Sequence, residues 1–284
     1  SPGATPIKPS IEGIDAPNVF TLRNIPDTYA IKDYVDHNKP KRAIVVGGGF
    51  IGLEIAENLH HKGMAVTVIE LANQVIGPID FEMAALVHNH LKEKGVEFYL
   101  EDGVKALQHD SQYTVVELNS GIKLKTDMVV LGIGVRPESE LAKKAGLELG
   151  ERGGIKVDQY LTTSDADIYA VGDAIEVVDY INGNPTLIPL AGPANKQGRI
   201  VANNICGTRE AYEGTQGTSV LKVFDMTVAS TGNNEKILKR FGIPYEKSFT
   251  HSASHAGYYP GAMPISLKLL FSPENGKVLG AQAV

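Results

Sequence analysis

Apolar and polar positions alternate along the first third of the chain in two different periods, which together predict strands joined by helices. Residues 43–46 form an apolar, β-branched run that is typical of a buried strand. After this run, Ile51, Ile55 and Leu59 recur every fourth residue and predict an amphipathic helix, which Gly63 is placed to end in a left-handed cap. A second apolar run at residues 66–70 predicts a neighbouring strand.

A second strand and helix pair follows directly. Asp80 is placed to cap a helix that Gly95 ends, and three apolar residues share one face of this helix: Met83, Val87 and Leu91. Residues 96–100 then predict another strand. The repeated order of strand, helix and strand is typical of a parallel α/β sheet.

The pattern changes to short strands after residue 112. Residues 113–118 and 122–126 flank an Asn-Ser-Gly turn and predict a hairpin, and the apolar run 128–133 predicts a buried strand. We therefore expect one nucleotide-binding α/β domain over residues 37–157.

The turn between the first strand and helix has the spacing G-x-G-x-x-G. Gly47 permits a tight turn, Gly49 lets a phosphate approach the backbone, and Gly52 lets the helix pack against the strand. The N–H groups at the start of the helix, at Phe50 and Ile51, would face an anion with the positive end of the helix dipole. This combination predicts a dinucleotide pyrophosphate site.

An acidic residue ends the second strand of this unit. Glu70 lies eighteen residues after Gly52, close to the spacing of about 20 at which a carboxylate reaches the ribose hydroxyls of NADH. Residues 71–74 include no Arg or Lys that could bind a 2′-phosphate. NADH is therefore the expected cofactor, with NADPH as the alternative.

Composition limits the remaining functions. The chain has 284 residues, is 43% hydrophobic and carries a net charge of −6, without the basic clusters of a nucleic-acid surface. No apolar run approaches the ~20 residues of a membrane span, and no signal peptide is visible. The single cysteine, Cys206, favours a cytoplasmic setting; it lies at the end of a predicted helix, either as a small structural residue or as a redox nucleophile.

The histidines do not predict a metal site. Neighbouring residues, or residues two apart, on a helix do not converge on one ion, so we expect His60, His61, His88 and His90 to lie on solvated helix faces.

A second constellation follows residue 160. Residues 162–173 predict a short strand that ends just before Asp173, at the sheet edge where open α/β sheets bind ligands. Asp173 could equally cap the segment that follows it.

Three segments together resemble the FAD-dependent pyridine nucleotide-disulfide oxidoreductases. They are the glycine turn at 47–52, the Gly-Ile-Gly-Val-Arg-Pro segment at 132–137 and the Tyr-Ala-Val-Gly-Asp segment at 169–173. Within that family, residues 190–199 and 255–261 are similar to coenzyme A-disulfide reductases, including forms fused to a rhodanese domain. The likeness covers the whole chain.

The resemblance implies a Rossmann-like NADH domain inserted in a partial FAD-binding domain, followed by an α+β interface domain. The implied segments are residues 1–36 and 158–218 for the FAD domain, 37–157 for the NADH domain and 219–284 for the interface domain. By the same resemblance Asp173 would bind a ribityl hydroxyl of FAD. The helix near Pro193 and Ala194 would face the flavin, Gly3 and Gly134 would border the cofactors, and Asn195 would meet coenzyme A.

Three further roles are implied. Glu54 would help to place the nicotinamide; its alternative is a solvated helix residue. Tyr258 and Tyr259 would approach the redox cysteine of a partner subunit in a homodimer; their alternative is an aromatic pair in a β core.

Two parts of the family pattern are not in this sequence: the first FAD-binding glycine motif and the redox cysteine that follows it. We therefore expect the chain to be a piece of a longer flavoenzyme that passes hydride from NADH to FAD and then reduces coenzyme A disulfide or persulfide through a cysteine. The alternatives are an NADH oxidase or peroxidase of the same fold, and a signalling protein that binds FAD and NADH without turnover.

Overall fold

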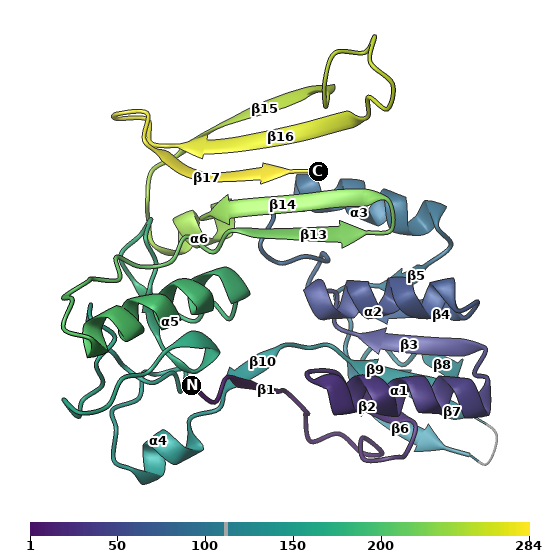
Figure 1. The fold of residues 1–284 in the computed structure, drawn as a ribbon. Coiled ribbons are helices and arrows are strands. Elements are labelled where there is room, and N and C mark those ends of the chain that lie inside the picture. Colours follow the sequence, from purple (N-terminus) through teal and green to yellow (C-terminus); the bar gives the residue numbers. More distant parts are fainter. Residues whose placement is uncertain (111–112) are drawn as a thin grey trace.

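A five-stranded parallel sheet forms the centre of the first lobe (Figure 1). The computed structural model describes residues 1–110 and 113–284. The sheet has the order β2-β9-β3-β4-β5, with β2 at Val19–Thr21, β9 at Met128–Leu131, β3 at Arg42–Val46, β4 at Ala65–Ile69 and β5 at Glu97–Tyr99. Its helices are α1 (Ile25–Asn38), α2 (Phe50–His61) and α3 (Phe81–Glu93). The predicted strand and helix order is confirmed.

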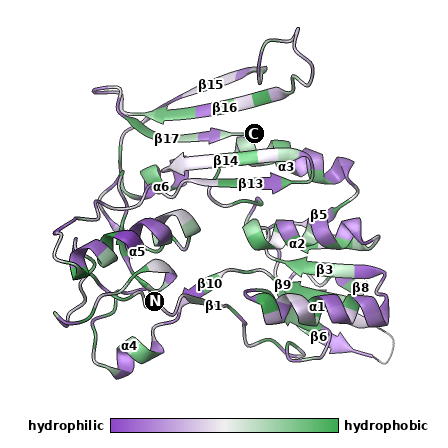
Figure 2. Cartoon of the chain, viewed as in Figure 1, coloured by the Kyte–Doolittle hydropathy of each residue, from purple (hydrophilic) through white to green (hydrophobic). Residues whose placement is uncertain are grey.

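Burial explains the sheet. Val45, Val68 and Val130 are fully buried and share one apolar cluster with α2 and α3, and β3 is largely green in the hydropathy colouring of Figure 2. Gly63 has φ +83° just after α2, as predicted for a left-handed cap.

A three-stranded antiparallel sheet covers the other face of the parallel sheet. It comprises β6 (Val104–His109), β7 (Thr114–Leu118) and β8 (Lys123–Thr126), of which β7 and β8 are the predicted hairpin. Leu107, Val116 and Leu118 pack against Ile44 and Val129 of the parallel sheet. The sequence pattern did not reveal β6.

The second lobe is joined to the first by a narrow pair of strands, β1 (Ala4–Pro6) and β10 (Val135–Pro137), which run antiparallel (Figure 1). It contains α4 (Glu140–Lys144), a 3₁₀ turn η1 (Gly172–Ala174), β11 (Val177–Val178), β12 (Pro185–Thr186) and α5 (Ala191–Ile205). The short strand predicted before Asp173, within residues 162–173, is wrong, because this segment forms only an isolated bridge between Thr162 and Tyr169.

The cores divide the chain differently from the expected segments. β2 pairs with β9 and Ile31 of α1 is buried in the parallel-sheet cluster, although both lie within residues 1–36. Ala142 and Ile155, within residues 37–157, are buried in the cluster of the second lobe. The chain therefore crosses between the two lobes at β1 and at β10.

The C-terminal region forms a five-stranded antiparallel sheet above both lobes (Figure 1). Its order is β13 (Ser219–Val223), β14 (Met226–Gly232), β17 (Val278–Ala283), β16 (Pro264–Phe271) and β15 (Glu246–Ala253), with α6 (Glu235–Arg240) between β14 and β15.

Two side-chain predictions are wrong. Asp80 occupies the N-cap position of α3, but its carboxylate makes no cap hydrogen bond and instead binds the side chains of Lys268 and Gln282. His88 is buried rather than solvated, because its Nε2 accepts a hydrogen bond from the Val75 N–H at 3.2 Å.

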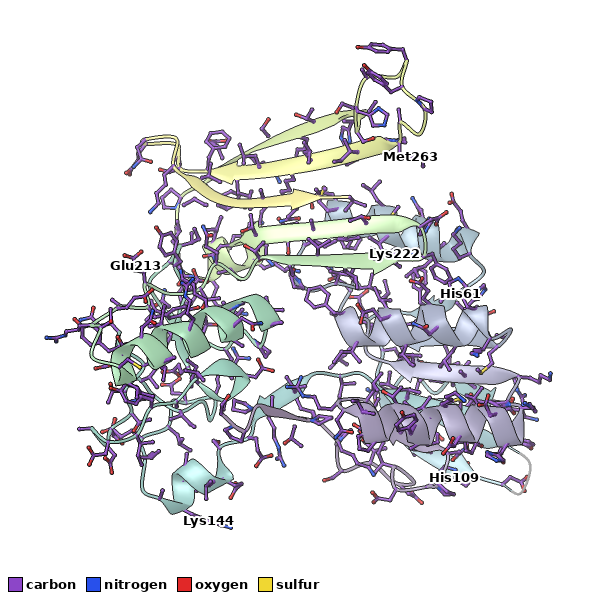
Figure 3. All side chains as sticks on the ribbon, viewed as in Figure 1. His61, His109, Lys144, Glu213, Lys222 and Met263 are labelled. Carbon is purple, nitrogen blue, oxygen red and sulfur yellow. The ribbon has the colours of Figure 1, made fainter. Side chains whose placement is uncertain are left out.

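Of the other three histidines, His60 and His90 are half-buried rather than solvated, whereas His61 is exposed as predicted. The rings of His60, His61 and His90 surround Phe224 of the β13–β14 turn, with ring centroids 5.3, 5.6 and 6.3 Å from it. His61 itself remains exposed (Figure 3).

Candidate functional site

A cavity of about 730 Å³ opens at the carboxyl end of the parallel strands, where β3 turns into α2. Its walls come from this turn, from the segment after β4, from the β7–β8 turn and from the crossing strand β10. Among its lining residues are Gly47, Gly49, Phe50, Ile51, Glu70 and Gly134, all predicted to bind cofactor.

The three glycines of the turn have the steric roles that their spacing predicted. Gly47 has φ +109°, and a Cβ there would lie 2.4 Å from the Gly132 carbonyl oxygen. A Cβ at Gly52 would lie 1.9 Å from the Gly47 carbonyl oxygen, so helix and turn can approach only without one. A Cβ at Gly49 would meet nothing within 4 Å, which leaves that position open toward the cavity.

The N-terminus of α2 faces this cavity without a side-chain cap. Gly49 is the N-cap residue, no side chain accepts from the first turn, and that turn holds no acidic residue. The N–H groups of Phe50 and Ile51 have no partner inside the helix, so an anion in the cavity can accept hydrogen bonds from them. The site therefore fits a pyrophosphate.

Glu70 holds the turn and the wall together. Its Oε2 accepts from the Gly48 N–H at 2.6 Å, and its Oε1 accepts from the Ala72 N–H at 2.8 Å. The carboxylate thus lies beside the glycine turn and lines the cavity, where ribose hydroxyls could share it.

Asp102 places a further negative charge in the first cavity, on the wall that also includes Asn119. Hydrogen bonds to its carboxylate, first from the Ser120 hydroxyl at 2.5 Å, hold the pKa of Asp102 below its ordinary value. Neither Asp102 nor the neighbouring lining residue Asn119 was singled out from the sequence, because isolated polar residues in turns carry no pattern.

A second cavity of about 680 Å³ lies next to the first. It is lined by residues of α5 together with Arg23, Asp173 and Pro189. Arg23 and Pro189 also line the first cavity, so the two spaces share a wall. No sequence signal pointed to either residue.

Arg23 and Asp173 form the polar corner of this second cavity. The guanidinium donates to Asp173 Oδ2 at 2.7 Å, and no described residue donates to Oδ1. A Cβ at Gly3 would lie 3.5 Å from the same guanidinium, which places Gly3 beside the corner. Asp173 can therefore accept a further hydroxyl hydrogen bond.

The N-terminus of α5 also faces this cavity without a side-chain cap. Ala194 and Asn195 line it, whereas Pro193, the third residue of the helix, does not. The Asn195 amide donates to the Ala191 carbonyl at 2.8 Å. The uncapped first turn offers N–H groups to a ligand with developing negative charge, as a flavin ring requires.

The remaining predicted site residues lie outside both cavities. Glu54 is exposed on the second turn of α2. Tyr258 and Tyr259 are 84% and 61% exposed, so they are not a pair in a β core. They lie in the loop between β15 and β16, and Met263 at the end of that loop marks the outer tip of the C-terminal sheet (Figure 3).

Cys206 is exposed and forms the C-cap of α5. It follows Asn195 by eleven residues, which is about 16 Å along a helix. Across residues 1–110 and 113–284, no group of three or more His, Cys, Asp or Glu side chains could hold a metal ion. In the same described parts, no helix is both long and apolar enough to cross a bilayer.

Comparison with known proteins identifies the fold. The pyridine nucleotide-disulphide oxidoreductase family matches residues 1–198, and its dimerisation domain matches residues 218–284. The chain belongs to this family. The predicted family, α/β fold class and oxidoreductase class are thereby confirmed, and so are FAD and NAD(P)H as the cofactors that the family uses.

Three similar proteins illustrate the match. The reduced Bacillus anthracis CoADR-RHD structure is 57% identical with a TM-score of 0.97 over 99% of this chain and 51% of that one. An NADH oxidase of Methanocaldococcus jannaschii is 37% identical over 99% of this chain and 62% of its own length. A CoA-dependent NAD(P)H sulfur oxidoreductase of Pyrococcus abyssi is 34% identical over 99% and 63%. The chain spans less than two thirds of the curated relatives that it matches.

Proposed function

We propose that this member of the pyridine nucleotide-disulphide oxidoreductase family carries the NADH site and part of the FAD site of an enzyme that reduces coenzyme A disulfide or persulfide. The observation that carries the proposal is the shared wall of Arg23 and Pro189 between the two cavities. The two cavities adjoin at these residues, so a nicotinamide in the first and a flavin in the second would lie next to each other. Such proximity is what hydride transfer between two bound cofactors requires.

FAD bound in the second cavity would accept hydride from NADH and pass the electron pair to a disulfide through a cysteine. In the overall reaction, NADH, one proton and one coenzyme A disulfide give NAD⁺ and two coenzyme A thiols. The protein's own contribution is to bind, orient and stabilise charge.

Each part of the first cavity has a role in that scheme. The N-terminus of α2 binds the pyrophosphate, and Glu70 binds the adenosine ribose hydroxyls and so favours NADH over NADPH. Gly134 borders the dinucleotide from the crossing strand. Glu54 helps to place the nicotinamide, a role that rests on the family resemblance.

The second cavity binds the flavin side. Asp173 accepts a ribityl hydroxyl at its free Oδ1. The N-terminus of α5 stabilises negative charge on the ring through the N–H groups of its first residues, Ala191 and Gly192, while Ala194 lines the cavity and Pro193, which has no N–H, follows them in the same turn. Asn195 meets coenzyme A, with Gly3 at the edge of the corner. The similarity to the CoA-dependent sulfur oxidoreductase of Pyrococcus abyssi supports this acceptor class.

A homodimer would complete the site. The dimerisation domain match covers residues 218–284, and the exposed Tyr258 and Tyr259 stand on a loop that can reach another subunit. We propose that they approach the redox cysteine of a partner subunit. The single, exposed Cys206 supports a reducing compartment such as the cytoplasm.

An NADH oxidase is the second candidate, because the relative from Methanocaldococcus jannaschii bears that name. The two enzymes differ in what the cysteine reduces: a sulfur compound, or oxygen or peroxide through a sulfenic acid. A signalling protein that binds both cofactors without turnover is the third.

An acceptor panel separates these candidates. The intact protein, purified with its flavin, is mixed with NADH and with coenzyme A disulfide, coenzyme A persulfide, oxygen or peroxide, while NADH loss and thiol release are followed. We expect the sulfur acceptors to react fastest. Turnover with oxygen or peroxide alone would favour the oxidase, and cofactor binding without any turnover would favour the signalling protein.

Two further samples test whether Cys206 is the redox nucleophile. A polypeptide limited to residues 1–284 should release no thiol, because no cysteine of this chain lies beside the flavin site. The Cys206→Ser variant of the intact protein should keep full activity. Loss of activity in that variant would make Cys206 the nucleophile.

A further inference from the structure

The segment between β4 and α3, residues 70–80, forms one wall of the first cavity; we call it the 70–80 loop. Glu70, Leu71, Gln74 and Gly77 line the cavity from this loop. Its Ile76 has φ +52°, a left-handed backbone that β-branched residues rarely adopt. Such a conformation persists only where surrounding contacts hold it.

The parallel-sheet lobe supplies some of these contacts. The Ile76 N–H donates to the Gly48 carbonyl at 2.8 Å, which ties the loop to the glycine turn. The buried Gln74 amide donates to the Ile79 carbonyl at 2.9 Å, and the Val75 N–H donates to His88. These bonds leave the carbonyls of Gly77 and Pro78 to be satisfied from elsewhere.

The C-terminal sheet satisfies them. The Lys236 ammonium donates to the carbonyls of Gly77 at 2.9 Å and Ile79 at 3.1 Å. The Asn234 amide donates to the carbonyls of Gly77 at 3.3 Å and Pro78 at 3.1 Å. Gly77 lines the first cavity, and its carbonyl oxygen is bound by two residues at the N-terminus of α6.

A fully buried lysine fixes the end of the loop. Lys268 of β16 has no exposed side-chain surface, and its ammonium donates to Asp80 at 2.7 Å, to Glu82 at 2.6 Å and to Glu235. The Gln282 amide donates to Asp80 at 2.7 Å and accepts from the Asp80 N–H at 2.7 Å. Lys268 thus joins the last residue of the loop to strand β16, and Gln282 joins it to strand β17.

The Glu235 carboxylate of this cluster is held in its charged form. Burial alone would raise the pKa of Glu235, but hydrogen bonds from Lys268, Tyr245 and Lys247 hold it far below its ordinary value. Removing Lys268 alone would take from the buried Asp80 carboxylate the one cation that pairs with it among the described residues, and proteins tolerate an unpaired buried charge poorly. The cluster therefore specifies one docked position of the sheet against the loop.

We propose that Lys268 and Lys236 are positioning residues for the dinucleotide site, holding the 70–80 loop in its NADH-binding conformation through the C-terminal sheet. The inference rests on the proposed function, because it takes the ligand of the first cavity to be NADH. If release of the loop lowers the fraction of competent protein, the apparent dissociation constant rises by that same factor. By linkage, NADH binding strengthens the docking of the sheet.

Two variants of the intact protein test the proposal. Lys236→Met removes the ammonium that donates to Gly77 and Ile79, whose carbonyls keep the amide donors of Asn234 and Gln74. Lys236 is an exposed residue, so the fold should persist. Lys268→Met combined with Asp80→Asn removes one positive and one negative charge from the buried cluster together. Lys277→Met is the matched control, because Lys277 is exposed in the β16–β17 turn and makes no ion pair among the described residues.

Calorimetric titration of each oxidised protein with NAD⁺, and initial rates over a range of NADH, give the dissociation constant, KM and kcat. We expect the dissociation constant and KM to rise about tenfold in both variants, as for a competent fraction near one tenth, while kcat stays within about twofold. FAD content should not change, and the rise in melting temperature on adding NAD⁺ should shrink. The control should match the unchanged protein.

Three results would overturn the proposal. An unchanged affinity of the folded Lys236→Met variant for NAD⁺ would overturn the proposal by itself, even if the double variant fails to fold. A fall in FAD content and kcat with unchanged affinity would indicate a merely structural role. Absence of any dinucleotide binding by the unchanged protein would overturn the proposed function and this inference together, which distinguishes that failure from the other two.

Discussion

Two helices, α2 and α5, each begin without a side-chain cap and open into neighbouring cavities, but their surroundings are built in opposite ways. The start of α2 is enclosed by consecutive residues of one turn, where Gly47 and Gly52 leave no space for a Cβ. The start of α5 faces a corner whose Arg23 and Asp173 lie 150 residues apart. The first site depends on backbone geometry and the second on side chains brought together by the fold.

The difference has energetic consequences. A backbone site tolerates almost no change of shape, because a new Cβ meets main-chain atoms that cannot move cheaply. The Arg23–Asp173 pair is partly exposed, with side-chain exposures of 33% and 15%, so the pair itself contributes at most about 1 kcal/mol. Asp173 therefore matters for what it binds more than for what it stabilises.

The largest expected effect comes from breaking the backbone site. Gly47→Ala should cost about 2–4 kcal/mol of stability and abolish measurable NADH binding, because it combines left-handed strain with overlap on Gly132. Gly49→Ala is the comparison: a Cβ there meets no protein atom, so the melting temperature should hold while NADH binding weakens about tenfold through one lost close approach to phosphate. Equal behaviour of the two variants would contradict the steric argument.

The next effect concerns the side-chain site. Asp173→Ala should loosen FAD by about 1.5–3 kcal/mol, the usual contribution of a hydrogen bond to a charged group, with little change in melting temperature of the flavin-free protein. Flavin absorbance per protein after dialysis measures it. Asp167→Ala, on an exposed residue of the preceding loop, should keep its flavin. If both variants retain FAD equally, Asp173 does not hold the ribityl chain.

The sequence predicted the backbone site at α2 better than the side-chain site at α5. Local patterns predicted β3, α2, β4 and α3, and the glycine spacing predicted where the first cavity lies, because periodicity and steric roles are set by neighbouring residues. The predictions for His88 and for the Asp80 side chain failed because tertiary contacts determined both environments. His88 is buried and accepts from the Val75 N–H, and the Asp80 carboxylate binds Lys268 instead of capping its helix.

The division of the chain between the two lobes also depends on contacts between distant residues. Residues 19–38 carry no feature that shows which lobe they join, and only the pairing of β2 with β9 assigns them. Arg23 and Pro189 join two cavities from positions far apart in sequence, so neither forms a motif. A single sequence does not show these contacts between segments that are far apart along the chain.

Glu70 combines the two kinds of site, because it is a binding side chain whose carboxylate is held by two backbone N–H groups. Glu70→Ala should weaken NADH by about 1–3 kcal/mol and narrow its preference over NADPH, since the ribose loses its charged acceptor and Gly48 and Ala72 lose theirs. Glu70→Gln keeps an acceptor oxygen and should lose less. Calorimetric titration that found tighter NADPH binding by the unmodified protein would refute the assignment.

The smallest expected effect is a pH dependence of protein stability that arises at His88, which bonds to the 70–80 loop beside the first cavity. Burial, with a smaller contribution from Lys92, holds the pKa of His88 below its ordinary value of 6.5. As pH falls through 6.5 the unfolded chain binds a proton that the folded protein resists, so stability falls with pH until the folded pKa is passed. His88→Gln keeps an acceptor for Val75 and should flatten the fall in melting temperature between pH 8 and pH 5. His255→Gln, on an exposed loop residue, should leave the slope unchanged. A slope that survives His88→Gln would show that other groups cause the acid sensitivity and that the wall does not depend on a neutral imidazole.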